Sequence, residues 1–142
     1  MTIYLDTSAV LRALLGDGDR LPEWGKWDRA YSSELMGVEA RRAIDRLRLE
    51  HALDDEGVAD AHQALAATER AIGVIRLTDE VLRRAGQPMP TVVKTLDAIH
   101  LASALLFAQY REAGLVFGTH DRGQATAARA LGFMVVGASN RA

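Results

Sequence analysis

The chain has 142 residues and no cysteine, which excludes a disulfide framework, catalysis by a thiol and any zinc site built on thiolates. Apolar residues make up 49% and charged residues 25%, a composition typical of a folded globular protein. The net charge of −2, taken alone, argues against a protein that binds nucleic acid. Because no apolar run is long enough to span a bilayer and the start does not resemble a secretory signal, we expect a cytoplasmic protein without membrane attachment.

Short runs typical of β-strands alternate along the chain with longer runs typical of helices. The expected strands cover residues 2–6, 30–33, 72–77, 115–118 and 133–136. The expected helices begin at Thr7 or Ser8 and end near residue 15, then cover 34–49, 54–71, 78–86, 96–113 and 123–131, with loops at 16–22 and 87–95. This alternation predicts an α/β fold with a parallel sheet covered by helices on both faces. Since no linker divides the chain, we expect a single domain over residues 1–142.

Acidic residues stand where this architecture places ligands, beyond the carboxyl ends of the strands. Asp6 and Asp121 each follow an expected strand, and Asp97 opens the apolar helix over 96–113. Each also has a simpler interpretation, because aspartate stabilises the first turn of a helix by capping it or by opposing its dipole. Position alone therefore leaves both interpretations open.

A fourth acid, Glu39, lies at the edge of the apolar stripe of the helix over 34–49. We expect Glu39 to point inward, whereas Glu34 falls on the opposite face and is expected to be surface charge. The simpler alternative for Glu39 is an exposed ion pair with Arg42, three residues further along the helix.

Four carboxylates at one edge of a sheet would repel one another, by about 3 kcal/mol for a pair ~5 Å apart at an effective dielectric of ~20. A hard divalent cation compensates that repulsion most simply, and ligands that are all oxygen select Mg²⁺ or Mn²⁺. Setting the four acids aside leaves fifteen acidic against seventeen basic residues. The objection to a polyanionic substrate then weakens.

Five segments occur in one order along nearly the whole chain: residues 5–9 (LDTSA), 38–42 (VEARR), 95–104 (TLDAIHLASA), 119–122 (THDR) and 127–133 (AARALGF). This ordered set resembles the PIN-domain family and, within it, the VapC-type toxin nucleases. The resemblance implies a three-layer α/β/α PIN-like fold with a central parallel sheet of four to five strands in the order 3-2-1-4-5. It also implies a homodimer that is inhibited by a cognate VapB-like antitoxin.

The same resemblance implies the toxin of a type II toxin–antitoxin system, an endoribonuclease that hydrolyses RNA phosphodiester bonds with Mg²⁺ or Mn²⁺. The residues that would hold the metal and carry the reaction are Asp6, Glu39, Asp97 and Asp121. No acid follows Asp121 in the chain, which leaves open whether one or two metal ions bind.

Two further sets of residues could support this chemistry. Ser8 and Thr119 could orient the carboxylates, although helix capping also explains Ser8. Arg41, Arg42 and Arg122 are candidates for contacts with RNA phosphates, with solvated surface charge as the simpler interpretation.

Two other functions stay open at this point. A metal-independent ribonuclease could use His100 and His120 as acid and base on the 2′-hydroxyl of RNA, although a histidine on an apolar helix is more often a core residue. A PIN-like scaffold could instead bind RNA or protein without cleaving it. Trp24 and Trp27 are more typical of packing than of base stacking.

Overall fold

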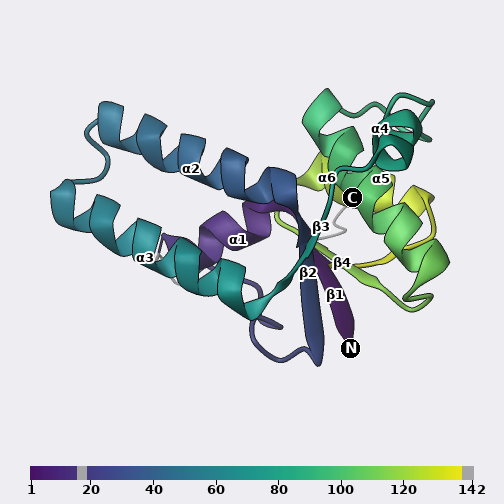
Figure 1. Ribbon diagram of the computed structural model, residues 1–142, viewed down its shortest axis with the longest axis horizontal. Helices are drawn as coiled ribbons and strands as arrows, with labels where there is room; N and C mark the ends of the chain where they lie inside the picture. Colours follow the sequence, from purple (N-terminus) through teal and green to yellow (C-terminus); the bar gives the residue numbers. More distant parts are fainter. Residues whose placement is uncertain (16–18, 139–142) are drawn as a thin grey trace.

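The computed structural model describes residues 1–15 and 19–138, and within them five strands form one sheet. The strands are β1 (Thr2–Leu5), β2 (Arg29–Ser33), β3 (Gly73–Ile75), β4 (Val116–Thr119) and β5 (Met134–Gly137). Their order across the sheet is β3-β2-β1-β4-β5, and every neighbouring pair is parallel (Figure 1). The expected strand order is confirmed. Part of the expected loop at 16–22 lies outside the described residues.

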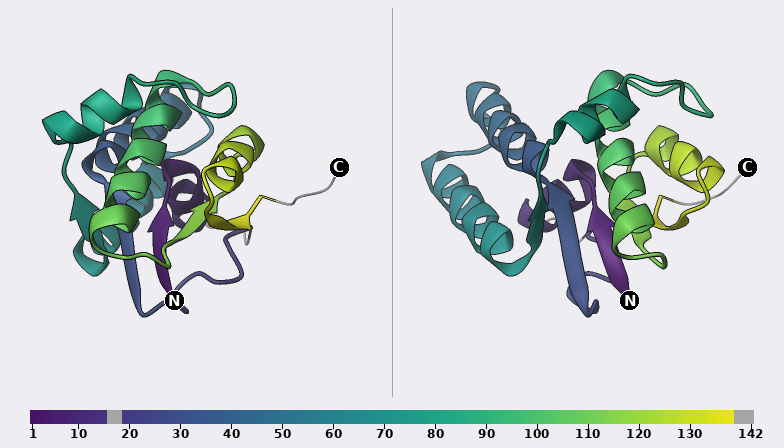
Figure 2. Two further views of the ribbon diagram at one scale, coloured as in Figure 1. Left: turned by 90° about the vertical axis from the view of Figure 1, so that its right-hand side faces the viewer. Right: turned by 45° about the vertical axis from the view of Figure 1, so that its right-hand side comes forward.

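The helices divide between the two faces of the sheet (Figures 1 and 2). The first set is α1 (Thr7–Leu14), α2 (Glu34–Leu49) and α3 (Asp55–Ala71), and the second is α4 (Asp79–Ala85), α5 (Thr95–Tyr110) and α6 (Arg122–Ala130). In Figure 1, α2 and α3 form a long antiparallel pair that extends beyond the sheet. No helix in the described part of the chain is long and apolar enough to cross a membrane.

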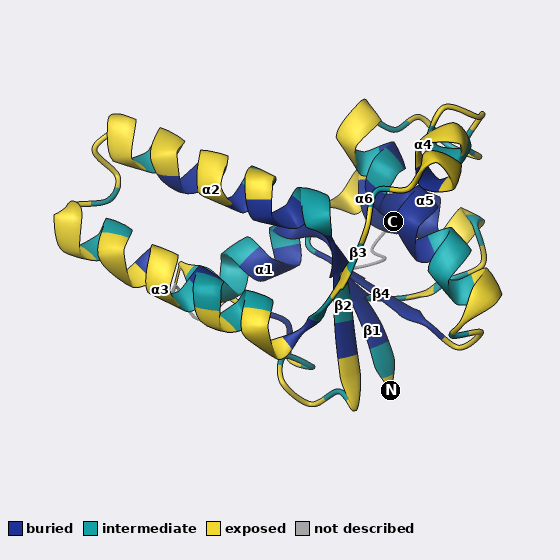
Figure 3. Cartoon of the chain, viewed as in Figure 1, coloured by how far each residue is buried: buried dark blue, intermediate teal, exposed yellow. Residues whose placement is uncertain are grey.

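The side-chain alternation of β1 divides the core in two. Ile3 and Leu5 pack with α1, α2 and α3, whereas Tyr4 packs with Phe117 of β4 against α5 and α6. All four side chains are fully buried. Figure 3 shows this burial as dark blue in the middle of the sheet and in α5, with exposed outer turns on α2 and α3. β1 is apolar on both faces because both are covered by helices, and its end is therefore fixed at the centre of the molecule.

The first strand ends one residue earlier than expected because Asp6 caps the helix that follows. Its Oδ1 accepts a hydrogen bond from the Ala9 backbone N–H at 3.1 Å. Thr7 and Ser8 form the first turn of α1, so the helix begins where the sequence predicts. Their hydroxyls are thereby released for other contacts, which are described below.

The expectation that Glu34 is plain surface charge is wrong. Glu34 opens α2, is only partly exposed, and its Oε1 accepts the backbone N–H of Leu77 at 2.6 Å. This bond takes the Leu77 amide away from the sheet, which helps to explain why β3 spans three residues rather than the expected six. The apolar helix is also shorter than expected: α5 ends at Tyr110, where Arg111 leaves helical geometry.

The two tryptophans pack against each other edge to face, with ring centroids of Trp24 and Trp27 5.1 Å apart. Both are partly buried against the core on the side of α1, α2 and α3. Their contribution in this fold is therefore packing, as their spacing indicated.

Candidate active site

A cavity of about 250 Å³ opens at the carboxyl edge of the sheet, where β1 and β4 end. All four acids line it: Asp6 after β1, Glu39 on α2, Asp97 in the first turn of α5 and Asp121 at the start of α6. The other lining residues are Thr7, Ser8, Leu11, Ala43, Arg46 and His100. The fold thus brings together four carboxylates that are far apart along the chain.

Asp6 is held by donors on both of its carboxylate oxygens, although only 4% of the residue is exposed. Oδ1 accepts hydrogen bonds from Ser8 Oγ at 2.6 Å and from the Ala9 backbone, and Oδ2 accepts one from Thr119 Oγ1 at 2.5 Å. Burial raises the pKa of Asp6, and these hydrogen bonds partly oppose that rise by favouring the charged form. The contacts fix the orientation of the carboxylate.

The turn between β4 and α6 is tied to Asp6 through the same two hydroxyls. The backbone N–H of His120 donates to Ser8 Oγ at 2.9 Å, and that of Asp121 donates to Thr119 Oγ1 at 2.9 Å. Asp121 also caps α6, since its Oδ1 accepts the Gln124 backbone N–H at 2.9 Å. Asp121 therefore has the capping role that the sequence allowed and a place at the cavity.

Glu39 points inward and does not pair with Arg42. Its Oε1 accepts a hydrogen bond from Thr7 Oγ1 at 2.6 Å and lies 2.6 Å from His100 Nε2. Burial acts to raise the pKa of Glu39, but the hydrogen bonds from His100 and Thr7 outweigh it and lower the pKa. Glu39 is thus held in its charged form beside the cavity.

Asp97 is the carboxylate with the least compensation. It is half-buried, and its pKa is raised by burial and then by the charges of Asp121 and Asp6. Among the described residues, none donates a hydrogen bond to its carboxylate. Only its backbone carbonyl is engaged, by Gln124 Nε2 at 3.2 Å, which ties α5 to α6. A cation in the cavity would supply the missing countercharge.

The donor chemistry of the cavity fits a hard divalent cation, because its charged ligands are carboxylates and no thiolate is present. Within residues 1–15 and 19–138, however, no three His, Asp or Glu side chains already stand in a metal-ligating arrangement. At least one oxygen of each of Asp6, Glu39 and Asp121 accepts a hydrogen bond from a hydroxyl, imidazole or amide group of the protein. The residues fit the cation, but their carboxylates do not form a preformed cage.

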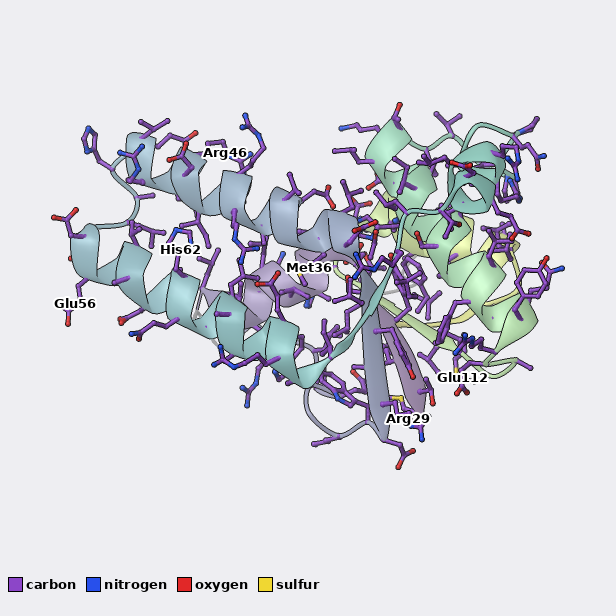
Figure 4. All side chains as sticks on the ribbon, viewed as in Figure 1. Arg29, Met36, Arg46, Glu56, His62 and Glu112 are labelled. Carbon is purple, nitrogen blue, oxygen red and sulfur yellow. The ribbon has the colours of Figure 1, made fainter. Side chains whose placement is uncertain are left out.

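The arginine that reaches the cavity is one that the sequence analysis did not single out. Arg46 lines it from α2, on which Figure 4 labels this residue. It follows Glu39 by seven residues and therefore lies on the same side of the helix, two turns further on. That spacing is the signal that could have found it. Arg41 instead binds Glu69 of α3, with nitrogen–oxygen distances of 2.7 and 3.1 Å. Arg42 is exposed and is not among the residues that line the cavity.

The histidines are not arranged as an acid–base pair. His100 is 2% exposed, with Nδ1 2.7 Å from the Tyr4 hydroxyl and Nε2 2.6 Å from Glu39. His120 is not among the residues that line the cavity. The geometry therefore does not support the metal-independent ribonuclease in which these two residues act on a 2′-hydroxyl.

Comparison with known families agrees with this fold. Residues 3–130 match the family model of the PIN domain. The chain therefore belongs to the PIN-domain family. Within the family it is of the VapC type. It is 32% identical over 143 residues to "Ribonuclease VapC46" of Mycobacterium tuberculosis, with 96% of this chain and 98% of that protein covered. It is 29% identical over 145 residues to "Ribonuclease VapC47" of the same species, with 93% of each covered.

Solved structures share the fold at low sequence identity. VapBC2 from Rickettsia felis, solved with a DNA fragment from its promoter, has a TM-score of 0.64 at 9% identity and covers 95% of this chain and 97% of its own. VapBC-5 from Mycobacterium tuberculosis has a TM-score of 0.62 at 17% identity and covers 96% of this chain and 98% of its own. PAE2754 from Pyrobaculum aerophilum has a TM-score of 0.61 at 24% identity and covers 95% of this chain and 83% of its own. These likenesses confirm the three-layer PIN-like fold.

Proposed function

We propose that this chain is the toxin of a type II toxin–antitoxin pair and an endoribonuclease that hydrolyses RNA phosphodiester bonds with Mg²⁺ or Mn²⁺. The observation that carries the proposal is the single cavity lined by Asp6, Glu39, Asp97 and Asp121. Membership of the PIN-domain family and the two ribonuclease relatives support the class of reaction.

In this proposal Asp6, Asp97 and Asp121 hold the cation, and Glu39 aligns the attacking water. When bound among these carboxylates, a divalent cation offsets the charge of the phosphate and lowers the pKa of a water molecule. Asp6 keeps its orientation through the hydroxyls around it, which leaves the remaining lone pairs of its oxygens for the cation. Glu39 accepts a hydrogen bond from the attacking water and so directs it towards the phosphorus.

The basic residue best placed to contact the RNA is Arg46. It is an exposed side chain that lines the same cavity as the four acids. A guanidinium group binds phosphate oxygens in a bidentate manner, and it would hold the backbone beside the carboxylates. Arg42 and Arg122 are also exposed and stay predicted phosphate contacts. Arg41 is engaged with Glu69 and is a weaker candidate.

The partners belong to the same proposal. We expect a homodimer bound by a cognate VapB-like antitoxin, in the cytoplasm, with one domain over residues 1–142. The match to the PIN domain over residues 3–130 supports the single domain. The VapBC complexes among the structural neighbours support a toxin–antitoxin pairing.

The test is end-group analysis of RNA incubated with the purified chain, with and without a chelator. Hydrolysis assisted by a metal leaves 5′-phosphate ends and stops in chelator. Cleavage that persists in chelator and leaves cyclic phosphates would contradict the metal-dependent mechanism. RNA that is bound but never cut, under any divalent cation, would instead favour the non-catalytic scaffold.

A further inference from the structure

Three side chains form a hydrogen-bonded line from the core to the cavity. Tyr4 lies on β1, is fully buried and does not line the cavity. Its hydroxyl is 2.7 Å from His100 Nδ1, and the two rings meet edge to face at 5.9 Å between centroids. His100 Nε2 then lies 2.6 Å from Glu39 Oε1. The line joins residues of β1, α5 and α2.

The direction of these hydrogen bonds follows from the chemistry of the groups. The ionised carboxylate of Glu39 only accepts, so Nε2 of His100 carries the proton that lies between them. In this tautomer Nδ1 is an acceptor, and the Tyr4 hydroxyl, 2.7 Å away, is placed to donate to it. The Nε2–H tautomer is thus matched on both sides of the ring, by Glu39 towards the cavity and by Tyr4 on the far side.

The two donors that reach Glu39 act on the same oxygen. Thr7 Oγ1 and His100 Nε2 both lie 2.6 Å from Oε1. No described residue donates to Oε2. One oxygen of the carboxylate is thus clamped by the protein, and the other is left for a ligand in the cavity.

We propose that His100 is a positioning residue for Glu39, and that the Tyr4 hydroxyl makes it one by selecting the Nε2–H tautomer. His100 fixes Oε1 and thereby presents Oε2 to the water in the cavity. This inference rests on the proposed function, because it assigns the task of the imidazole in that same site. Partners that orient a catalytic carboxylate in this way typically change activity by ~10–100-fold when they are removed.

Two substitutions of His100 separate its two hydrogen bonds. In His100→Asn the short side chain places its amide near the position of Nδ1 and loses the donor to Glu39. In His100→Gln the longer side chain places an N–H near the position of Nε2 and keeps that donor. We expect His100→Asn to lower kcat for RNA cleavage by ~10–100-fold with KM little changed, and His100→Gln to recover part of the lost rate.

Tyr4→Phe tests whether Tyr4 selects the tautomer of His100, because it removes only the hydroxyl, and Tyr4 does not line the cavity. It keeps the ring that stacks on Phe117, so the fold is retained. The matched control is Tyr31→Phe: Tyr31 is the register partner of Tyr4 on β2, and it lines a different cavity, next to β3, α4 and α5. We expect Tyr4→Phe to lower kcat in the same sense as His100→Asn, and Tyr31→Phe to leave it unchanged.

A readout independent of catalysis is the ¹⁵N spectrum of the His100 imidazole, recorded without metal. We expect the wild type to show a proton on Nε2 alone and Tyr4→Phe to show a mixture of tautomers. A proton on Nδ1 in the wild type would overturn the inference. So would wild-type rates in both Tyr4→Phe and His100→Asn, or an equal loss in Tyr31→Phe. If the wild type cleaves no RNA, the proposed function fails, while the spectrum still decides whether Tyr4 sets the tautomer.

Discussion

The Thr119 hydroxyl donates a hydrogen bond of 2.5 Å to Asp6 Oδ2, across 113 residues of sequence. The parallel register of β1 and β4 places the two residues side by side, since Leu5 pairs with Gly118. Thr119 is fully buried, and its oxygen also accepts the backbone N–H of Asp121 at 2.9 Å. One hydroxyl therefore holds one acid by its carboxylate and a second by its backbone.

This arrangement predicts the effect of Thr119→Val, which keeps the shape of the side chain and removes the hydroxyl. Asp6 and the Asp121 amide each lose a buried partner. We therefore expect the free energy of unfolding, measured in urea, to be ~1–3 kcal/mol lower than in the wild type. We expect RNA cleavage to fall by ~10–100-fold. Thr119→Ser keeps the hydroxyl and serves as the control. A valine variant that cleaves at the wild-type rate would show that this bond does not position Asp6.

Asp97→Asn is predicted to separate activity from stability. RNA cleavage should be lost, because Asp97 is a proposed ligand of the cation, and retained cleavage would refute the assignment of Asp97. Without metal, the variant should be more stable than the wild type at pH 7, because the charge it removes is half-buried and faces Asp121 and Asp6.

The pH dependence of that stability difference follows from the raised pKa of Asp97. The folded chain holds this proton more tightly than the unfolded chain, so the wild type loses stability as the pH rises from ~4, the ordinary value for aspartate, through the raised pKa. The difference in the free energy of unfolding between Asp97→Asn and the wild type should therefore disappear when the pH is lowered below ~4. Urea midpoints measured in chelator across this range check the sign, and a gap that widens in acid would contradict it.

Binding of the cation is predicted to stabilise the fold through Asp6. A ligand that binds only the folded chain adds about 2.7 kcal/mol at a hundredfold excess over its Kd. We expect Mg²⁺ or Mn²⁺ to raise the Tm of the wild type and of Asp45→Asn, an exposed acid of α2 paired with Arg48. The rise should be smaller in Asp6→Asn. Equal shifts in all three proteins would mean that the cation binds elsewhere.

Arg46→Gln is predicted to weaken the binding of RNA without removing the acids. Binding is measured in the Asp97→Asn background, so that the RNA stays intact. Loss of one phosphate contact lowers the slope of log affinity against log salt by about 0.7 for a single strand. Arg48→Gln is the control, because Arg48 is engaged with Asp45 and does not line the cavity. The same change of slope in both variants would show that Arg46 makes no specific contact.

The parts of the fold that depend on local sequence were predictable. Asp54 and Thr78 cap α3 and α4, and the strands follow short apolar runs. The four acids could be grouped because residues that follow parallel strands share one edge of the sheet. Their individual hydrogen bonds could not be predicted in the same way, since Asp6 uses donors from its own helix and from β4.

The contacts that sequence reasoning missed join residues that no local pattern connects. Glu34 and Leu77 are 43 residues apart, and Tyr4 and His100 are 96 residues apart. Their pairing depends on how β3 leaves the sheet and how α5 crosses it, which is set by packing of the whole domain. Arg46 was accessible in principle, because its spacing from Glu39 is two helical turns.

The place of β4 beside β1 also determines the point in synthesis at which the chain can complete its active-site cavity. A nascent chain that has emerged from the ribosome only as far as residue 110 carries Asp6, Glu39 and Asp97 but not β4, so one edge of β1 is still unpaired. The cavity is completed only after Thr119 and Asp121 emerge, because domains generally fold as units. A prematurely terminated product that ends before β4 and α6 would therefore lack the completed cavity.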